Sequence, residues 1–381
     1  MFIKKLMYFP LNILVGMVLS FILALFKFSF FFREVSIQHG FYVFVIGLGV
    51  ILQYIFCRKY LISQNNYYVN CNGYKFYLIL AILIFLIEFF IYGTPALKSG
   101  GRDETGVLPF FHVLGYSYFI FANLLVSMYG GKKQIIICSL IIVLFSILLL
   151  SRQLLMFSII TTILSLLWRY PLSYKFWMRL LLLLIILTFL FGTIGNYRQN
   201  LSNDYVSNYI FLVGGANKEG EKIGDALFWI WLYLASPMYN LLVNFDSYYD
   251  LGNKCNSAID FGSCDGNYIS SVLLPDVLNK YFGLKNFLID LQMSHLNVGT
   301  GFATAARLNG ILGVFLQMIF QVLFFIFGYK LTNYRYRNAF TIYYSSLSLF
   351  LIFDNLFTRA EFFFVFILLF LVHFKFRVFP K

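Results

Sequence analysis

Long apolar runs recur along this chain, and they constrain its fold more than any other feature of the sequence. Many reach about 17 residues, the length that an α-helix needs to cross the hydrocarbon core of a bilayer. Only 12% of the residues are charged, about half the share that is usual in a soluble domain. We therefore expect an all-α polytopic membrane protein with about ten transmembrane helices. The expected spans are an uncleaved first helix from Lys4-Lys5 to about Phe26, then His39–Cys57, Phe76–Tyr92, Pro109–Tyr129, Gln134–Leu150, Leu154–Trp168, Arg179–Gly195, Leu308–Tyr329, Phe340–Phe357 and Phe362–Phe374.

The charged residues separate between the two sides of such a bundle. With the N-terminus in the cytoplasm, the cytoplasmic segments hold 16 of the 29 Lys and Arg residues and none of the 16 Asp and Glu residues. Lys and Arg in short cytoplasmic loops set the orientation of membrane proteins. We therefore expect both termini in the cytoplasm and attribute the net charge of +13 to topology. No basic stripe with interleaved aromatics lies on a polar segment, so no nucleic acid partner is expected.

A long polar segment, Asn196–Arg307, interrupts the apolar pattern. It divides the chain into spans one to seven (1–195), a large extracytoplasmic loop (196–307) and spans eight to ten (308–381). Inside the loop, Ala226–Val243 is apolar enough to span, but one more crossing would move the basic residues after it to the outside. We therefore expect a re-entrant or interfacial helix that is broken near Pro237. A second apolar patch, Tyr268–Leu288, is expected on the membrane surface.

The cysteines follow the same division. Cys57, Cys71 and Cys138 lie in or near cytoplasmic parts and are expected as free thiols. Cys255 and Cys264 lie in the outward loop, where an oxidising compartment would favour a disulfide over two free thiols.

Five arginines lie at or near the outward ends of the expected spans: Arg102, Arg152, Arg198, Arg307 and Arg359. A guanidinium group binds phosphate oxygens with two hydrogen bonds and stays charged at any working pH. Several of these arginines therefore suit a diphosphate at the membrane surface, and glycines beside Arg102 and Arg198 would let a ligand approach the backbone. Arg152 stands between two almost wholly apolar runs, so it either serves a function or snorkels to the headgroups as a turn residue.

His295, in the sequence Ser294-His295-Leu296-Asn297, is the candidate general base that would remove a proton from an attacking hydroxyl. The alternative is a loop histidine that only hydrogen-bonds its neighbours. Outward acids could serve as the base instead, and Glu361 could simply pair with Arg359 at the surface. No phosphate-binding GxGxxG or GxxxxGKS/T loop is present, and no acids cluster at helical spacing, so neither a cofactor nor a metal is expected. The acidic alternatives are Asp290, Asp103, Glu104 and Glu361, and the histidines that we interpret as structural are His39, His112 and His373.

Together these patches make the chain similar to the O-antigen polymerases, the Wzy-type oligosaccharide repeat-unit polymerases. The matching pieces are Pro95–Arg102, Leu150-Ser151-Arg152, Gly195–Arg198, and His295–Thr300 followed by Arg307 and Gly310. The resemblance covers nearly the whole chain in topology but only these short patches in sequence. It implies a GT-C-like fold and transfer of a growing glycan from undecaprenyl diphosphate to a new lipid-linked repeat unit, with inversion.

The same resemblance implies the roles of the residues and the partners. Arg102, Arg152, Arg198 and Arg307 would hold the diphosphates of donor and acceptor, and His295 would activate the acceptor hydroxyl. The partners would be undecaprenyl-diphosphate-linked glycans, membrane lipid and a chain-length regulator protein, at the bacterial cytoplasmic (inner) membrane. O-antigen ligases look similar and also place a histidine in the large loop, so a ligase is one alternative. A polysaccharide flippase or other transporter is an alternative of another class, although it would more naturally show charges within spans and inverted repeats.

Overall fold

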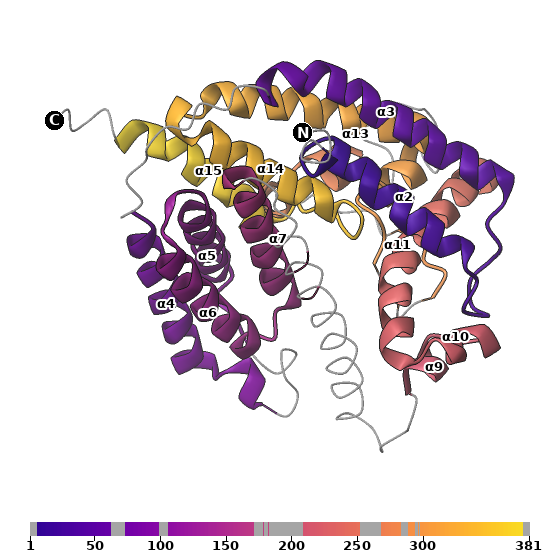
Figure 1. Cartoon of the computed structure of the whole chain (residues 1–381), viewed down its shortest axis with the longest axis horizontal. Coiled ribbons are helices and arrows are strands. Elements are labelled where there is room, and N and C mark those ends of the chain that lie inside the picture. Colours follow the sequence, from indigo (N-terminus) through magenta and orange to yellow (C-terminus); the bar gives the residue numbers. More distant parts are fainter. Residues whose placement is uncertain are drawn as a thin grey trace.

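A computed structural model of the chain describes residues 6–61, 73–98, 106–170, 178, 182, 209–251, 268–282, 289–293, 296 and 298–375. Within these ranges the regular elements are helices, and the only β-type pairing is an isolated bridge between Ser29 and Ala216. Figure 1 shows α4 to α7 as one group, α2, α3 and α13 to α15 as a second group above it, and α11 along the side. The all-α architecture that the sequence predicts is confirmed at this level.

Nine of the ten expected spans coincide with helices, and the tenth, Arg179–Gly195, lies outside the described residues apart from position 182. Within the described residues, five helices are long and apolar enough to cross a membrane: α3, α4, α5, α11 and α13. These helices support a membrane protein. The helices that match expected spans are α2 (Leu11–Leu25), α3 (Ile37–Leu61), α4 (Gly73–Tyr92), α5 (Pro109–Tyr129), α6 (Lys132–Leu148), α7 (Arg152–Arg169), α13 (Ala303–Leu331), α14 (Arg337–Phe350) and α15 (Ala360–Lys375).

The sequence explains how α6 and α7 are joined, which matters because this turn precedes Arg152. Ser151 caps α7, because its side-chain oxygen accepts a hydrogen bond from the backbone N–H of Leu154. Leu150 has a φ of 51°, a left-handed conformation that is uncommon for leucine. The connection is therefore tight, and Arg152 is the first residue of α7.

One end of the bundle gathers basic residues. Arg58 and Lys59 lie in the last turn of α3, and Arg169, in the last turn of α7, donates to the carbonyls of Ser127 and Gly130 at 2.8 Å each. Cations at the C-termini of helices interact favourably with the exposed carbonyls. We call this end of the bundle the basic end. At the opposite end, α2 ends and α3, α5, α7 and α13 begin, and we call it the site end. Which side of a membrane each end faces stays a prediction.

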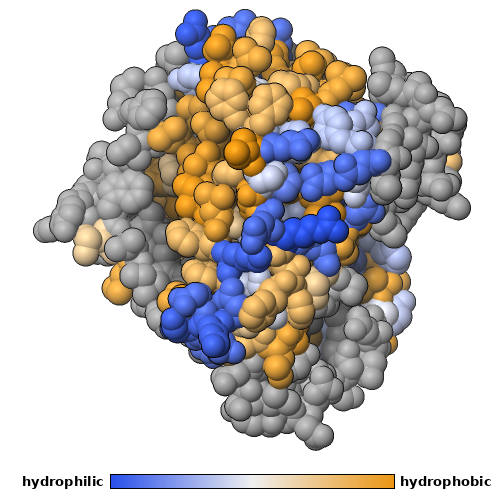
Figure 2. All heavy atoms as spheres, turned by 90° about the vertical axis from the view of Figure 1, so that its right-hand side faces the viewer, coloured by the Kyte–Doolittle hydropathy of each residue, from blue (hydrophilic) through white to orange (hydrophobic). Residues whose placement is uncertain are grey.

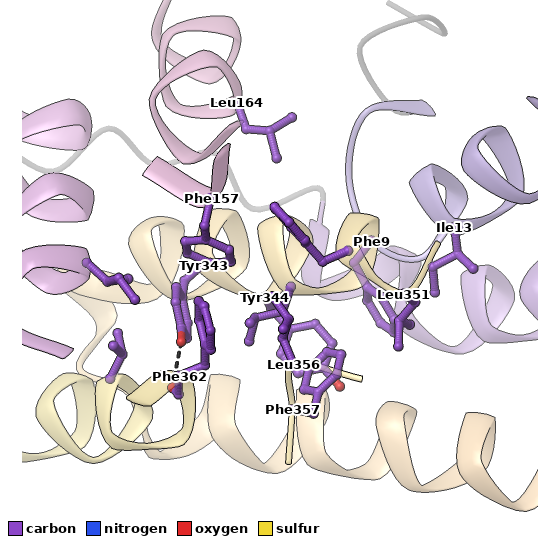
Figure 3. Packing of buried hydrophobic residues seen from close by; sticks show 14 of the residues in the cluster. Phe9, Ile13, Phe157, Leu164, Tyr343, Tyr344, Leu351, Leu356, Phe357 and Phe362 are labelled. Carbon is purple, nitrogen blue, oxygen red and sulfur yellow. Dashed lines mark hydrogen bonds between the residues drawn. The ribbon is translucent and has the colours of Figure 1, made fainter. Parts of the chain in front are cut away.

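Buried aromatic rings fill the centre of the second group of helices. Figure 3 shows Tyr343 and Tyr344 of α14 packed among Phe9, Phe157 and Phe362. Both tyrosine hydroxyls donate to backbone carbonyls, that of Phe362 and that of Gln321, at 2.6 Å each. Close packing and internal hydrogen bonds are what hold helices together in lipid, because lipid tails are as apolar as the side chains.

The segment expected as one large loop (196–307) is itself largely helical where it is described. It contains α9 (Tyr209–Val213), α10 (Lys218–Lys222), α11 (Asp225–Leu251), the π-helical turn η2 (Ile269–Leu273) and α12 (Asp276–Tyr281). The apolar patch expected on the membrane surface instead begins in the interior, since Tyr268 and Val272 are buried and the Tyr268 hydroxyl donates to the carbonyl of Gly313 in α13. The helix α13, which follows this segment, begins at Ala303, so Arg307 lies within α13 and not at the end of the loop.

The prediction that the helix in this loop breaks near Pro237 is wrong. The helix α11 continues for 27 residues with Pro237 inside it. A proline within a helix removes one hydrogen bond and costs about 3 kcal/mol, and the burial of α11 on several sides offsets that cost.

The contacts of α11 show how it crosses its neighbours. Trp231 donates to the carbonyl of Leu23 at 2.8 Å, and Tyr239, eight residues later, donates to the adjacent carbonyl of Ala24. Eight residues of helix span about 12 Å, yet both contacts fall on the same turn of α2. The helix α11 therefore crosses the end of α2 and does not run alongside it, as the right-hand side of Figure 1 shows.

Candidate functional site along α11

Of the residues singled out in the sequence, Arg102, Arg198 and His295 lie outside the described residues, and so do Asp103, Glu104 and the pair Cys255 and Cys264. Arg152, Arg307, Asp290, Arg359 and Glu361 are described. Cys57 and Cys138 are free and buried, as expected.

Two asparagines one turn apart on α11 hold the loop that leads into α13. Asn244 accepts a hydrogen bond from the backbone N–H of Asp290 at 3.0 Å and donates to the carbonyl of the same residue at 2.8 Å. Asn240 donates to the carbonyls of Leu296 and Val298 at 2.9 and 2.8 Å, and accepts from the N–H of Gln292 at 3.1 Å. Both asparagines are buried. The side-chain amides of Asn240 and Asn244 therefore satisfy backbone N–H and C=O groups of the loop, which has no helix or strand partners. These hydrogen bonds hold residues that precede and follow His295 in the sequence.

Asp290 also forms an ion pair with Arg307 of α13. The Nε atom of Arg307 donates to Oδ2 of Asp290 at 2.6 Å. The Arg307 side chain is 1% exposed, while that of Asp290 is 38% exposed. The guanidinium is thus enclosed by protein, and the carboxylate reaches solvent on one side. A charge-assisted hydrogen bond of this length is among the stronger polar contacts in a protein, so it orients the carboxylate.

A kink in α13 directly follows Arg307. Asn309 and Gly310 leave the helical conformation, with φ and ψ of −138° and 22° at Asn309 and of 54° and −142° at Gly310. The conformation of Gly310 is accessible essentially to glycine alone. A Cβ atom there would lie 2.5 Å from Cε1 of Tyr248, which belongs to α11. Glycine is therefore required at position 310 for two reasons: its backbone conformation, and the close approach of α11.

Arg152 lies on the same face of α11. Its Nη1 atom donates to the hydroxyl of Tyr233 at 2.9 Å. Tyr233, Asn240, Asn244 and Tyr248 follow each other at spacings of seven, four and four residues, which places them on one side of a helix. Tyr233 and Asn244 are about 16 Å apart along the helix axis. We call these four residues the polar stripe of α11. One part of the stripe contacts Arg152, and another part contacts the Asp290 loop.

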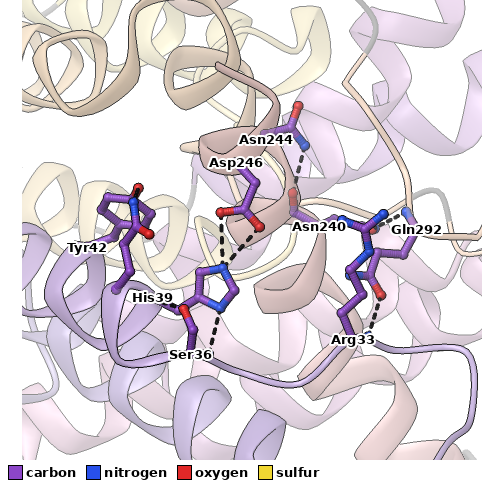
Figure 4. A network of polar contacts seen from close by, with 9 residues as sticks. Arg33, Ser36, His39, Tyr42, Asn240, Asn244, Asp246 and Gln292 are labelled. Carbon is purple, nitrogen blue, oxygen red and sulfur yellow. Dashed lines mark hydrogen bonds and ion pairs between the residues drawn. The ribbon is translucent and has the colours of Figure 1, made fainter. Parts of the chain in front are cut away.

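The opposite face of α11 packs on α2 and α3. His39 accepts from the backbone N–H of Ser36 through Nδ1 at 3.0 Å, and its Nε2 lies 3.0 and 3.1 Å from the two carboxylate oxygens of Asp246 (Figure 4). Because Nδ1 accepts a hydrogen bond, the ring proton is on Nε2 and points to the carboxylate. Both ring nitrogens are occupied, so His39 connects two helices and has the structural role that the sequence predicts.

His112 is likewise structural. Its Nδ1 lies 2.8 Å from Oε2 of Glu88, and the other oxygen of Glu88 accepts from the backbone N–H of Leu108 at 3.0 Å. Glu88 is 4% exposed. This carboxylate joins α4 to the start of α5.

Arg359 forms a separate surface cluster. Its Nη2 lies 3.0 Å from Oδ2 of Asp354, and its Nη1 lies 3.6 Å from Oδ2 of Asp276. The charge of Asp354, joined by the charges of Asp276 and Glu361 and opposed by burial, raises the pKa of the Arg359 guanidinium. The ion pairs of Arg359 are made by the two aspartates, and Glu361, the surface partner considered from the sequence, adds its charge to them. They already neutralise Arg359, so it is a poor ligand for a phosphate.

Arg33 is not among the residues singled out in the sequence, and the structure places it beside the Asp290 loop. Its backbone N–H donates to Oε1 of Gln292 at 3.3 Å, and its side chain is exposed (Figure 4). Tyr233, Asn240 and Asn244 were also missed. The two asparagines could have been noticed, since buried amides at a four-residue spacing inside an apolar helix are unusual and point to a polar contact.

Figure 2 shows the face of the molecule on which α2 ends and α10 lies. A band of hydrophilic residues crosses this face and separates two hydrophobic surface regions. In the described part of the chain, no group of three or more His, Cys, Asp or Glu residues could hold a metal ion. Comparison of the chain with protein-family models, with curated proteins and with solved structures found no match.

Proposed function

We propose that this chain polymerises undecaprenyl-diphosphate-linked oligosaccharide repeat units on the outer face of the bacterial cytoplasmic membrane, in the synthesis of O-antigen or capsule. The observation that carries the proposal is the ion pair between the partly exposed Asp290 carboxylate and the buried Arg307 guanidinium. This pair lies on the same face of α11 as Arg152. Ten spans, a GT-C-like fold and cytoplasmic termini belong to the same proposal.

In the proposed reaction, a hydroxyl of the new repeat unit attacks the anomeric carbon of the growing chain on the side opposite its diphosphate. The new bond to oxygen forms while the bond to undecaprenyl diphosphate breaks, so the configuration inverts. The diphosphate leaves with the bonding electrons, and the hydroxyl proton passes to a general base. Because the diphosphate-linked sugar is already activated, the protein needs to position two lipids and stabilise the leaving group.

Two residues of one loop are candidates for the base. Asp290 is partly exposed, its backbone is held by Asn244 and its carboxylate by Arg307. A fixed carboxylate that reaches solvent suits proton transfer. His295, which the resemblance implies as the base, lies five positions further along the same loop. The experiment below separates them.

The arginines divide between two roles in this proposal. Arg152 is partly exposed and, together with Arg102 and Arg198, is proposed to bind the diphosphates. Arg307 is enclosed and contacts Asp290, so we assign it to positioning the carboxylate and not to direct phosphate binding. Membrane lipid and a chain-length regulator protein are the further partners proposed.

The experiment is a length ladder of surface glycan from cells that lack this chain and are complemented with variants. Wild type restores the ladder, and Arg152→Ala leaves single repeat units, while Arg152→Lys keeps the charge and restores part of the ladder. The two candidate bases are compared with the variants Asp290→Asn and His295→Ala. The base is the residue whose replacement abolishes polymer while the variant protein is present in the membrane at the wild-type amount. Polymer that forms on the carrier lipid but fails to reach its final acceptor would indicate a ligase. Repeat units left on the cytoplasmic leaflet would indicate a transporter, and either result overturns the proposal.

A further inference from the structure

An apolar groove of about 600 Å³ lies between the last turns of α2 and the first turns of α3, at the site end. Phe21 and Leu25 line it from α2, and Ile37, Phe41 and Phe44 line it from α3. Leu25, Ile37, Phe41 and Phe44 are exposed. From Ile37 to Phe44 the groove follows α3 for about 10 Å, so it can accept a stretch of hydrocarbon chain.

The connection between α2 and α3 places charges at one end of this groove. Val35 and Ser36 line the groove, and Arg33, two residues earlier, is exposed. Lys27 and Glu34 form an exposed ion pair at 2.9 Å, and the hydrogen bond and charge of Lys27 lower the pKa of Glu34. These two charges cancel, and the connection between α2 and α3 therefore has a net positive charge, which comes from Arg33.

This positive end lies against the candidate site. The backbone N–H of Arg33 donates to Gln292, and Gln292 is two residues from Asp290. On the other side of the same helices, α11 holds α2 through Trp231 and holds α3 through Asp246. Along the chain, Arg33 thus stands close to Val35 and Ser36, which line the groove, and its own backbone contacts Gln292 in the Asp290 loop.

We propose that this groove holds the isoprenoid chain of a polyprenyl diphosphate, with Arg33 against the diphosphate. The proposal rests on the proposed function, since it assigns an entry site to one of the two lipid substrates. A guanidinium binds a diphosphate through parallel hydrogen bonds, and the apolar groove beside it takes the adjoining chain. The head of the lipid then lies next to the loop that carries Asp290.

Gly40 offers a way to fill the groove without disturbing the helices. It lines the groove, and a Cβ atom there would meet only Cζ of Phe21, at 3.9 Å, which is an ordinary contact. Alanine at this position should therefore fit and favour the helix. The larger side chain of leucine extends into the groove, so Gly40→Leu is the test variant and Gly40→Ala its matched control.

The experiment is photo-crosslinking of the full chain in lipid vesicles, with a photoreactive phenylalanine analogue in place of Phe41. Vesicles contain either undecaprenyl diphosphate or, as an anionic lipid with two chains, dioleoyl phosphatidylglycerol at equal charge. We expect the photoreactive residue to crosslink labelled undecaprenyl diphosphate, and we expect an excess of unlabelled undecaprenyl diphosphate to reduce this crosslinking. Gly40→Leu should reduce it at least tenfold and Gly40→Ala should leave it unchanged. Arg33→Ala should weaken binding of undecaprenyl diphosphate at least fivefold without affecting uncharged undecaprenol.

Equal crosslinking of phosphatidylglycerol, or crosslinking that Gly40→Leu does not change, would overturn the proposal and indicate an ordinary lipid-facing surface. The readout needs no glycan transfer, so it separates this proposal from the proposed function. If crosslinking fails while the glycan ladder still depends on Arg152, only the groove proposal falls. If crosslinking succeeds while the ladder is insensitive to Arg152→Ala and to both candidate bases, the lipid site stands and the polymerase proposal falls.

Discussion

Replacing Asp290 by asparagine tests the buried ion pair most directly. The change keeps the shape of the side chain but leaves the Arg307 guanidinium, 1% exposed, without its anion. Removing one partner of a fully buried ion pair costs about 3 to 5 kcal/mol. Because Asp290 is 38% exposed and solvent screens it, we expect roughly 2 to 3 kcal/mol. That loss corresponds to a roughly 30- to 150-fold change in the ratio of folded to unfolded protein.

A second substitution separates stability from chemistry. In the double variant Asp290→Asn with Arg307→Met, the isolated buried cation is gone, and apolar replacement of a buried pair is often close to neutral. We therefore expect the double variant to recover most of the lost stability while polymer formation stays absent, if Asp290 is the base. The matched control is Asp354→Asn in the exposed Arg359 cluster, where loss of a surface pair costs less than about 1 kcal/mol.

The measurement is thermal inactivation of purified protein in one detergent at one scan rate, because unfolding of such a protein is governed by kinetics. The glycan ladder is read from the same variants in cells. The reasoning fails if Asp290→Asn is no less stable than Asp354→Asn, or if the double variant is as unstable as the single one. A double variant that regains polymer would remove Asp290 from the chemistry.

Three further substitutions test the stripe on α11. Asn244→Ala removes two hydrogen bonds to Asp290 and should cost about 2 kcal/mol and most of the polymer, as protease sensitivity and the ladder will show. Gly310→Ala should cost about 1 to 3 kcal/mol in thermal inactivation, whereas Gly73→Ala, with open space around its added Cβ, should be neutral. Tyr233→Phe removes the acceptor of Arg152 and should lower the rate of polymer formation about fivefold to tenfold. Unchanged behaviour in all three would exclude the stripe as a functional unit.

The positions of the helices could be predicted because apolar length and helix-ending residues are local properties. Pro109 begins α5 as expected, and Ser151 caps α7. Pro237 shows the limit of such reasoning. A proline weakens a helix by a predictable amount, but whether the helix breaks depends on neighbours that the local sequence does not reveal.

The site could be predicted only in part, for the same reason. Arg152 and Arg307 stood out because they lie at or near the outward ends of expected spans, yet their partners, Tyr233 and Asp290, are 81 and 17 positions away. Burial of Arg307 changed its proposed role, and burial is a property of the folded chain. Arg33 could not be predicted as part of the site, because nothing in its own segment links it to Gln292, 259 positions later.

The continuity of α11 through Pro237 has a mechanical consequence. Tyr233 and Asn244 are on one helix that continues through Pro237, so a tilt of the whole helix moves both residues. A tilt of that helix that pulls Tyr233 away from Arg152 also shifts the amide that holds the backbone of Asp290. A ligand beside Arg152 that tilts α11 would therefore also shift Asn244, about 16 Å further along the helix, and with it the backbone of Asp290.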